Sequence, residues 1–107
     1  MNFARQYLQE TQAILARLDA EAIESLARLV QETRAAGGRV FVLGVGGSAA
    51  NASHFVNDLR KICGIEAYAP TDNVSELTAR TNDEGWPSVF EAWLRVSRLQ
   101  SSDMVFV

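Results

Sequence analysis

The chain has 107 residues, of which 48% are hydrophobic and 21% charged, with a net charge of -3 at pH 7. This length suits a single domain, residues 1–107, with a modest core. The acidic balance provides no basic stripe, so nucleic acid is not an expected partner. The single cysteine, Cys63, excludes an internal disulfide, and no stretch approaches the roughly 20 apolar residues of a membrane span. We therefore expect a cytoplasmic protein that binds neither nucleic acid nor membranes.

Two amphipathic helices are predicted at the N-terminus. Apolar side chains recur three and four residues apart over Phe3–Leu18 and again over about Ala20–Ala36, and a glycine pair then stops the second helix. The stripe of the second helix that is expected to be buried consists of Ile23, Leu26, Ala27, Val30 and Thr33. Residues 1–36 are thus predicted to form a helical pair that precedes β/α units in residues 37–107.

A strand, a glycine turn and a helix follow in that order. Arg39–Leu43 is a β-branched and aromatic run that predicts a buried parallel strand, and a helix is predicted over about Ser48–Ile62. Between them lies the glycine loop, Leu43-Gly44-Val45-Gly46-Gly47-Ser48. Its glycines let the backbone approach a ligand closely, and a helix N-terminus attracts anions, so the loop is predicted to hold a phosphate. Ser48 is expected to cap the helix and to offer its hydroxyl to the anion.

The predicted helix after the loop has an apolar face and a polar face. The apolar face comprises Ala52, Phe55, Val56, Leu59, Ile62 and Cys63, and the polar face comprises Asn51, His54, Asp58 and Lys61. His54 and Asp58 are four residues apart, close enough to share a metal or to act as an acid and base pair. The alternative is a His–Asp hydrogen bond on a solvated face. A phosphate at the loop would place the rest of a sugar beside the pair, which favours the functional interpretation.

The remaining sequence predicts further β/α elements. A strand is predicted over Ile65–Ala69, followed by a short helix from Asp72 or Asn73 to about Arg80 and a polar loop over Thr81–Gly85. A further helix is predicted over about Pro87–Leu99, and a last strand runs from Met104 to Val107. The side chains of the further helix that are expected to face the core are Val89, Phe90, Trp93, Val96 and Leu99. The fold class is α/β, a three-layer parallel sheet flanked by helices. A parallel strand normally delivers its functional loop just past its carboxyl end. We therefore expect that the C-terminal half of the domain is missing.

A dinucleotide site is an alternative interpretation of the loop. Gly44–Ala49 satisfies the pattern G-x-G-x-x-G/A, and Asp72 lies near the position of a ribose-binding acid. Two features argue against it, because two helices precede the first strand and Pro70 separates Asp72 from the second strand. Asn82 and Asp83, taken alone, are ordinary turn residues.

Taken together, these motifs resemble the sugar isomerase (SIS) domain family, in particular its phosphoheptose isomerase branch. The resemblance runs from about Gly37 to Val107, and its elements occur in the family order. They are Gly38-Arg39-Val40 leading into the glycine loop, His54-Phe55 followed by Asp58, and Leu77-Thr78-Ala79 leading to Asn82-Asp83.

The resemblance implies a flavodoxin- or Rossmann-like SIS fold and a homotetramer with active sites at subunit interfaces. The implied activity is the aldose–ketose isomerisation of sedoheptulose 7-phosphate to a heptose 7-phosphate, an early step toward heptose for lipopolysaccharide or capsule. An enediolate is its intermediate, and a carboxylate shuttles the proton.

The resemblance also implies roles for particular residues. Val45, Gly46, Gly47 and Ser48 would line the sugar phosphate, and Asn82 and Asp83 would hold its hydroxyls. His54 and Asp58 would be two ligands of a bound zinc, and Asp58 would also be the catalytic carboxylate that contacts the substrate. The remaining ligands, a Gln and a His, and a serine-rich second phosphate loop are expected beyond residue 107.

Three positions depart from the family pattern. Val45 stands where the family usually has Asn, Asp58 where it has Glu, and Asn73 where an acid is common. These departures leave other interpretations open. One is a different sugar-phosphate isomerase, and the other is a non-catalytic SIS protein that binds sugar phosphates as a regulator or acts as a tetrameric adaptor, in which His54 and Asp58 need not bind metal.

Overall fold

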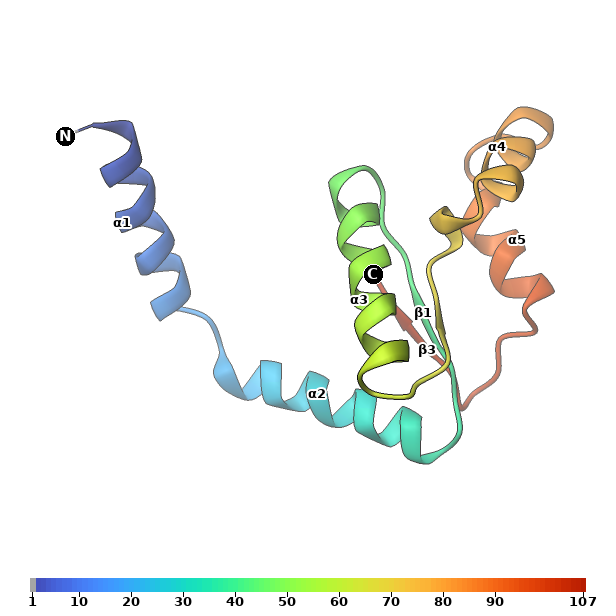
Figure 1. Cartoon of the computed structure of the whole chain (residues 1–107), viewed down its shortest axis with the longest axis horizontal. Coiled ribbons are helices and arrows are strands. Elements are labelled where there is room, and N and C mark those ends of the chain that lie inside the picture. Colours follow the sequence, from blue (N-terminus) through green and yellow to red (C-terminus); the bar gives the residue numbers. More distant parts are fainter. Residues whose placement is uncertain (1) are drawn as a thin grey trace.

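The computed structural model describes residues 2–107 and contains a three-stranded parallel sheet (Figure 1). The strands are β1 (Val40–Val42), β2 (Ala67–Tyr68) and β3 (Met104–Phe106), in the order β2-β1-β3. Val40 of β1 lies opposite both Ala67 and Met104 in the register. Helices join successive parallel strands, as such connections require. The predicted α/β class with a parallel sheet is therefore confirmed.

The core lies between the sheet and helix α3 (Gly47–Lys61). Side chains alternate across a strand, so Val40 and Val42 face α3 while Phe41, which is fully buried, faces the other way. From α3 the core takes Ala52, Val56 and Leu59. These three belong to the predicted apolar face, and their burial fixes the rotation of α3 about its axis. Ile62 was also predicted on that face but is 75% exposed, because α3 ends at Lys61.

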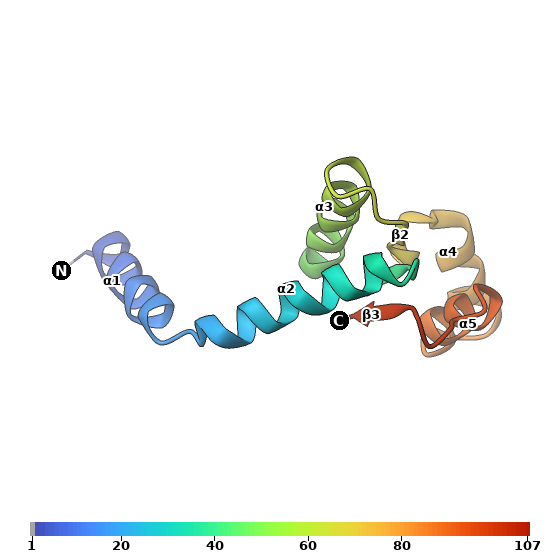
Figure 2. The same ribbon diagram turned by 90° about the horizontal axis from the view of Figure 1, so that it is seen from below.

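The other helices form a hairpin after β2. A short 3-10 helix, η1 (Pro70–Asp72), leads into α4 (Val74–Asp83), which packs against α5 (Ser88–Val96). Figures 1 and 2 place the strands between α3 and this α4–α5 hairpin. Two predictions for the last helix are wrong, since Val96 is 67% exposed and Leu99 lies beyond the end of α5.

Helix α4 is longer than predicted and takes in residues 81–83 of the segment expected to be a polar loop. The side chain of Asn73 accepts a hydrogen bond from the amide of Glu76 and caps the helix, as expected. At the other end, the amide of Glu84 still donates to the carbonyl of Arg80, at 2.8 Å. Asn82 and Asp83 therefore lie in the last turn of a helix, because continued backbone hydrogen bonding outweighs their preference for turns.

An ion pair fastens β3 to β1. The carboxylate of Asp103, 3% exposed, accepts a hydrogen bond at 2.8 Å from the guanidinium of Arg39. It also accepts from the backbone amides of Arg39 and Gln100. Hydrogen bonding to Arg39 lowers the pKa of Asp103 to about 2, against the opposing effect of burial. Asp103 is therefore ionised at neutral pH and holds the two strands in register.

Helices α1 (Phe3–Ala16) and α2 (Ala20–Ala35) form an arm that extends from the sheet (Figures 1 and 2). Neither helix has a buried residue, and Val30 and Thr33 near the end of α2 are only half-buried. The predicted burial of the α2 stripe is therefore wrong for Ile23, Leu26 and Ala27, whereas Val30 packs partly against the core. The three- and four-residue periodicity identifies an apolar stripe correctly but carries no information about what covers it. In the described residues, no helix is both long enough and apolar enough to cross a bilayer.

Candidate anion site at the glycine loop

The glycine loop turns the chain from β1 into α3 by a tight backbone turn. Gly46 has φ 61° and ψ -120°, the angles of the first central residue of a type II′ turn, which strongly favours glycine. The turn closes through a hydrogen bond from the Ser48 amide to the Val45 carbonyl, at 3.2 Å. Gly44 is required for a different reason, since a Cβ there would lie 2.4 Å from the carbonyl oxygen of Ser48. The glycine pattern therefore serves both the dihedral angles and close packing.

The hydroxyl of Ser48 bonds within the loop. Its Oγ accepts a hydrogen bond from the Val45 amide at 2.8 Å and donates one to the Val45 carbonyl at 2.9 Å. The expectation that Ser48 caps α3 is wrong, because the cap position is occupied by Gly46 and no side chain caps the helix. In the turn, the Ser48 hydroxyl both donates to a carbonyl and accepts from an amide. As a helix cap it would only accept from one amide, so the turn satisfies more of its hydrogen-bonding capacity.

Two backbone amides remain for a ligand at this turn. Among the hydrogen bonds of the described residues, none uses the amides of Gly46 or Gly47 as donors. Gly46 is the N-cap of the 15-residue helix α3 and Gly47 is its first residue, and the dipole of α3 favours negative charge at this end. A Cβ added at Gly46 or at Gly47 would meet nothing within 4 Å, so the backbone of the turn is not packed against other atoms on that side. The geometry suits a small anion.

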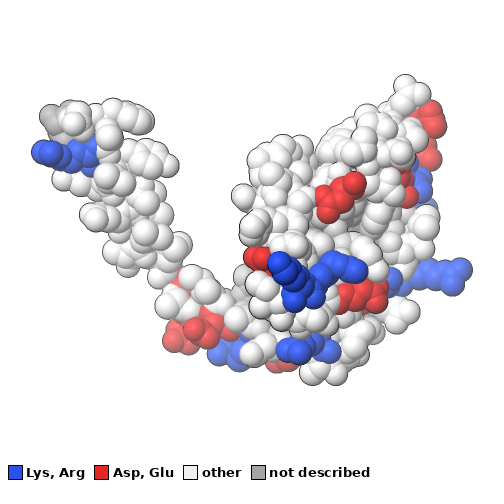
Figure 3. Space-filling view, in the orientation of Figure 1, with Lys and Arg blue, Asp and Glu red and all other residues white. Residues whose placement is uncertain are grey.

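The surroundings of the loop carry little side-chain charge. The end of α3 next to the loop is largely uncharged in Figure 3. A cavity of about 310 Å³ opens beside the loop and contains no lysine or arginine in its lining. It is lined by Val42, Leu43, Ser48, Asn51, Ala52, Phe55, Phe106 and Val107. Within the described residues, the attraction for an anion at this site therefore comes from backbone dipoles rather than from cationic side chains.

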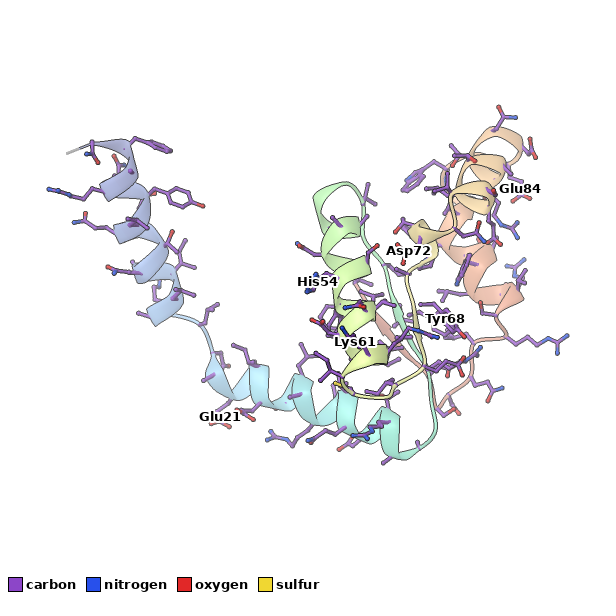
Figure 4. The ribbon with its side chains drawn as sticks, in the orientation of Figure 1. Glu21, His54, Lys61, Tyr68, Asp72 and Glu84 are labelled. Carbon is purple, nitrogen blue, oxygen red and sulfur yellow. The ribbon has the colours of Figure 1, made fainter. Side chains whose placement is uncertain are left out.

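His54 and Asp58 lie together but outside that cavity. The distance from Nε2 of His54 to Oδ2 of Asp58 is 3.5 Å, as the spacing predicted. The imidazole is 78% exposed and the carboxylate 43% exposed. Figure 4 shows His54 on the face of α3 opposite to Asp72, projecting into solvent. The pair does not line this cavity.

The His–Asp pair fits zinc in donor type and separation. Zinc bonds to imidazole nitrogen and carboxylate oxygen at about 2.0–2.2 Å in tetrahedral geometry, which puts two ligand atoms roughly 3.3 Å apart. The observed separation is close to this value. No cluster of three or more metal-ligating side chains occurs in residues 2–107. The pair therefore suits half of a metal site.

Asn82 and Asp83 lie on α4, apart from the loop. Nδ2 of Asn82 donates a hydrogen bond to Oδ1 of Asp83 at 2.9 Å, and both residues are exposed. Asn82 lines a separate, open cavity of about 630 Å³ together with Leu77, Thr78, Thr81 and Trp86. Ser48 of the loop and Asn82 of α4 thus line different cavities.

Asn51 is a polar residue of the loop cavity that the sequence interpretation did not single out as a site residue. It lines the cavity with Ser48, three residues earlier on α3. The available signal was this spacing, because residues three and four apart share a helix face. Its amide group is exposed and able both to donate and to accept hydrogen bonds.

Comparison with known proteins identifies the family. The sequence pattern described as the SIS domain matches residues 6–107, nearly the whole chain. The chain belongs to the SIS domain family. Within it, the relatives and the structural neighbour place the chain in the phosphoheptose isomerase branch.

Three relatives illustrate the similarity. A probable phosphoheptose isomerase of Thermoplasma acidophilum is 35% identical over 92 residues, covering 81% of this chain and 50% of the relative. The lincomycin biosynthesis protein LmbN of Streptomyces lincolnensis is 36% identical over 104 residues, 88% of this chain and 38% of LmbN. The phosphoheptose isomerase GmhA of Neisseria gonorrhoeae superposes with a TM-score of 0.84 at 28% identity, covering 95% of this chain and 55% of GmhA. This SIS chain therefore spans about half the length of the proteins it matches.

Proposed function

We propose that this SIS chain is part of a sugar-phosphate aldose–ketose isomerase whose substrate is sedoheptulose 7-phosphate and whose product is a heptose 7-phosphate. The proposal is carried by one observation, the tight glycine turn that leaves two amides free at the start of α3 in a chain of the phosphoheptose isomerase branch. Relatives named as phosphoheptose isomerases support the reaction class, and the loop supports a phosphorylated substrate.

The loop's role is to bind and orient the substrate. The phosphate would lie against the amides of Gly46 and Gly47, beside Val45 and Ser48, far from the carbons that react. Binding energy gained there fixes the position of those carbons and so lowers the barrier to reaction. Val45 replaces a side-chain donor by an isopropyl group that is 58% exposed, so the amides must supply the hydrogen bonds.

Asp58 is the proposed catalytic carboxylate. Isomerisation removes a proton from the carbon next to a carbonyl and returns it to the neighbouring carbon by way of an enediolate. A carboxylate can accept this proton and give it back. Asp58 is one methylene shorter than Glu, so the substrate must come closer to α3 than in a site that uses Glu. Asn82 and Asp83 would bind sugar hydroxyls.

His54 and Asp58 would hold a divalent metal, zinc in the first instance. When bound, the metal supplies Lewis-acid stabilisation of negative charge on a substrate oxygen. His54 binds through a ring nitrogen, and its neutral form is required for this. Because the pair is exposed and outside the loop cavity, the proposal requires further ligands and a wall of the site from residues outside this segment or from a second subunit. A cytoplasmic homotetramer with sites at its subunit interfaces would provide the latter.

The alternative is a non-catalytic SIS protein that binds a sugar phosphate. The observation in its favour is that His54 and Asp58 do not line the cavity beside the loop. In that case the loop alone carries the function, as a sensor or within an assembly.

Two measurements on the protein at its full encoded length separate these functions. We expect about one zinc per subunit by metal analysis and conversion of sedoheptulose 7-phosphate. His54→Ala should lower the zinc content, whereas Glu91→Gln, which changes an exposed carboxylate on α5, should leave both properties unchanged. Sugar-phosphate binding without turnover or metal would support the alternative, and no binding would exclude both.

A further inference from the structure

The only proton of the Ser48 hydroxyl is used inside the loop. A serine hydroxyl has one proton to donate, and here that proton goes to the carbonyl of Val45 at 2.9 Å. One of its lone pairs accepts from the amide of Val45 at 2.8 Å. The Val45 carbonyl also accepts from the Ser48 amide. Three hydrogen bonds therefore link the two residues at the ends of the turn.

A phosphate cannot bind this hydroxyl as it stands. The oxygens of a phosphate dianion are hydrogen-bond acceptors and need donors. The only proton of Ser48 Oγ points to Val45, so the atom would present lone pairs to the anion. To donate to phosphate, Ser48 would have to release the Val45 carbonyl and weaken the turn that positions Gly46.

The neighbouring amides meet the requirement instead. Those of Gly46 and Gly47 donate to no other group in the described part of the chain, and these residues are the N-cap and the first residue of α3. Their directions depend on the dihedral angles of Gly46, which the hydrogen bonds at either end of the turn hold in place. The hydrogen bonds between Val45 and Ser48 therefore also fix the directions of the Gly46 and Gly47 amides.

We propose that Ser48 is a positioning residue that braces the turn and so aims the amides of Gly46 and Gly47 at a phosphate, which it does not itself contact. The proposal rests on the proposed function, since it takes phosphate as the ligand of the loop. It revises the expectation that the Ser48 side chain binds the anion.

Amide exchange in the unaltered protein provides the first test, with inorganic phosphate as the probe. In protein labelled with nitrogen-15 at valine and glycine, we expect the Val45 amide to exchange slowly without phosphate, because Ser48 accepts its hydrogen bond. Adding phosphate should shift the signals of Gly46 and Gly47 and leave the Val45 amide equally protected. Faster exchange of Val45 on adding phosphate would overturn the proposal, since it would mean that Ser48 turns to the anion.

Three variants provide the second test. Ser48→Ala should lose the protection of the Val45 amide and bind phosphate about five- to tenfold more weakly, as expected for the loss of one or two hydrogen bonds. Ser48→Thr keeps the hydroxyl and should restore both properties. The matched control is Ser53→Ala, which removes a hydroxyl of α3 that bonds to Asp72 rather than to the loop, and which should leave both unchanged.

The failures of the two proposals are distinguishable. If Ser48→Ala weakens phosphate binding but leaves the exchange of Val45 unchanged, Ser48 contacts the ligand directly and the positioning role is wrong. If phosphate shifts no loop amide even at saturating concentration, the phosphate ligand of the proposed function is wrong. Rapid exchange of the Val45 amide in the unaltered protein would show that Ser48 does not accept its hydrogen bond. The positioning role would then be wrong, whatever ligand the loop binds.

Discussion

The sheet with α3 and the arm formed by α1 and α2 use the same kind of sequence pattern with opposite results. Apolar residues recur at helical spacing in all three helices, yet α3 buries three of them and neither α1 nor α2 buries any. Leu59 of α3 is 3% exposed, whereas Leu15 of α1 is 61% exposed. The contrast shows that an amphipathic pattern specifies which face needs a partner and leaves the identity of that partner to the tertiary fold.

The candidate functional features follow the same division. The glycine loop, the loop cavity and the His54–Asp58 pair all belong to β1, α3 and β3. The arm instead presents an exposed apolar surface that includes Phe3, Tyr7, Leu8, Ile14, Leu15, Leu18 and Ile23. We therefore expect the sheet region to respond to core mutations and ligands, and the arm to respond to protein concentration.

A matched pair of leucine substitutions tests the contrast most strongly. Leu59→Ala should lower the free energy of unfolding by about 3–4 kcal/mol, because it leaves a cavity between α3 and the sheet. Leu15→Ala should change it by no more than about 0.5 kcal/mol when protein is dilute. Urea denaturation followed by circular dichroism provides both values. Equal losses for the two variants at all concentrations would show that the arm is as tightly packed as the core.

Removing the ion pair between β1 and β3 should have the next largest effect. Asp103→Ala leaves Arg39 and two backbone amides without their acceptor, and we expect a loss of about 3 kcal/mol. The exposed pair of Glu91 and Arg95 is the comparison, and Glu91→Gln should cost less than about 0.5 kcal/mol. A similarly small loss for Asp103→Ala would contradict the assigned role of this carboxylate.

Two glycine substitutions sharpen the account of the loop. Gly44→Ala forces a Cβ against the backbone of Ser48 and should destabilise the protein by about 2 kcal/mol. Gly47→Ala enters open space and should have little effect on stability. Thermal unfolding of the two variants without ligand measures the difference. Indistinguishable melting temperatures would show that the backbone of the loop is not packed as described.

Acid should weaken the sheet region in a defined range of pH. The pKa of Asp103 is lowered to about 2 in the folded protein, from 3.8 ordinarily, so its contribution to stability is complete above about pH 4. That contribution is lost as pH falls from about 4 to 2, to a total of roughly 2 kcal/mol. In Asp103→Asn this part of the stability profile should disappear. If the free energy of unfolding falls equally steeply with falling pH in both proteins, carboxylates other than Asp103 cause the loss of stability.

The sequence predicted those features that depend on local chemistry. The order of elements, the parallel sheet and the glycine turn follow from hydrophobic runs and turn residues in Arg39–Leu43 and Gly44–Gly47, and the contact of His54 with Asp58 follows from helical spacing. The bonding of Ser48 was missed because the cap rule considers only the helix amides and ignores the carbonyl of Val45.

Other features depend on long-range structure and were not predictable. The turn propensity of Asn82 and Asp83 indicated a loop, but backbone hydrogen bonds continue α4 through both residues. The relation of the His54–Asp58 pair to the loop cavity depends on how α3 rotates when Ala52 and Leu59 are buried. The apolar stripe of α3 indicates which face is buried, but it does not indicate where a ligand lies relative to the opposite face.

Proton transfer to the substrate is the most direct test of the central claim, that the loop and Asp58 serve an aldose–ketose isomerase. The protein at its full encoded length is incubated with sedoheptulose 7-phosphate in deuterium oxide, and the sugar phosphate is analysed by mass spectrometry. The account predicts a heptose 7-phosphate that has gained one deuterium on carbon, and a loss of at least about a hundredfold in rate for Asp58→Asn. Binding of sedoheptulose 7-phosphate without formation of a heptose 7-phosphate, or full activity of Asp58→Asn, would contradict it.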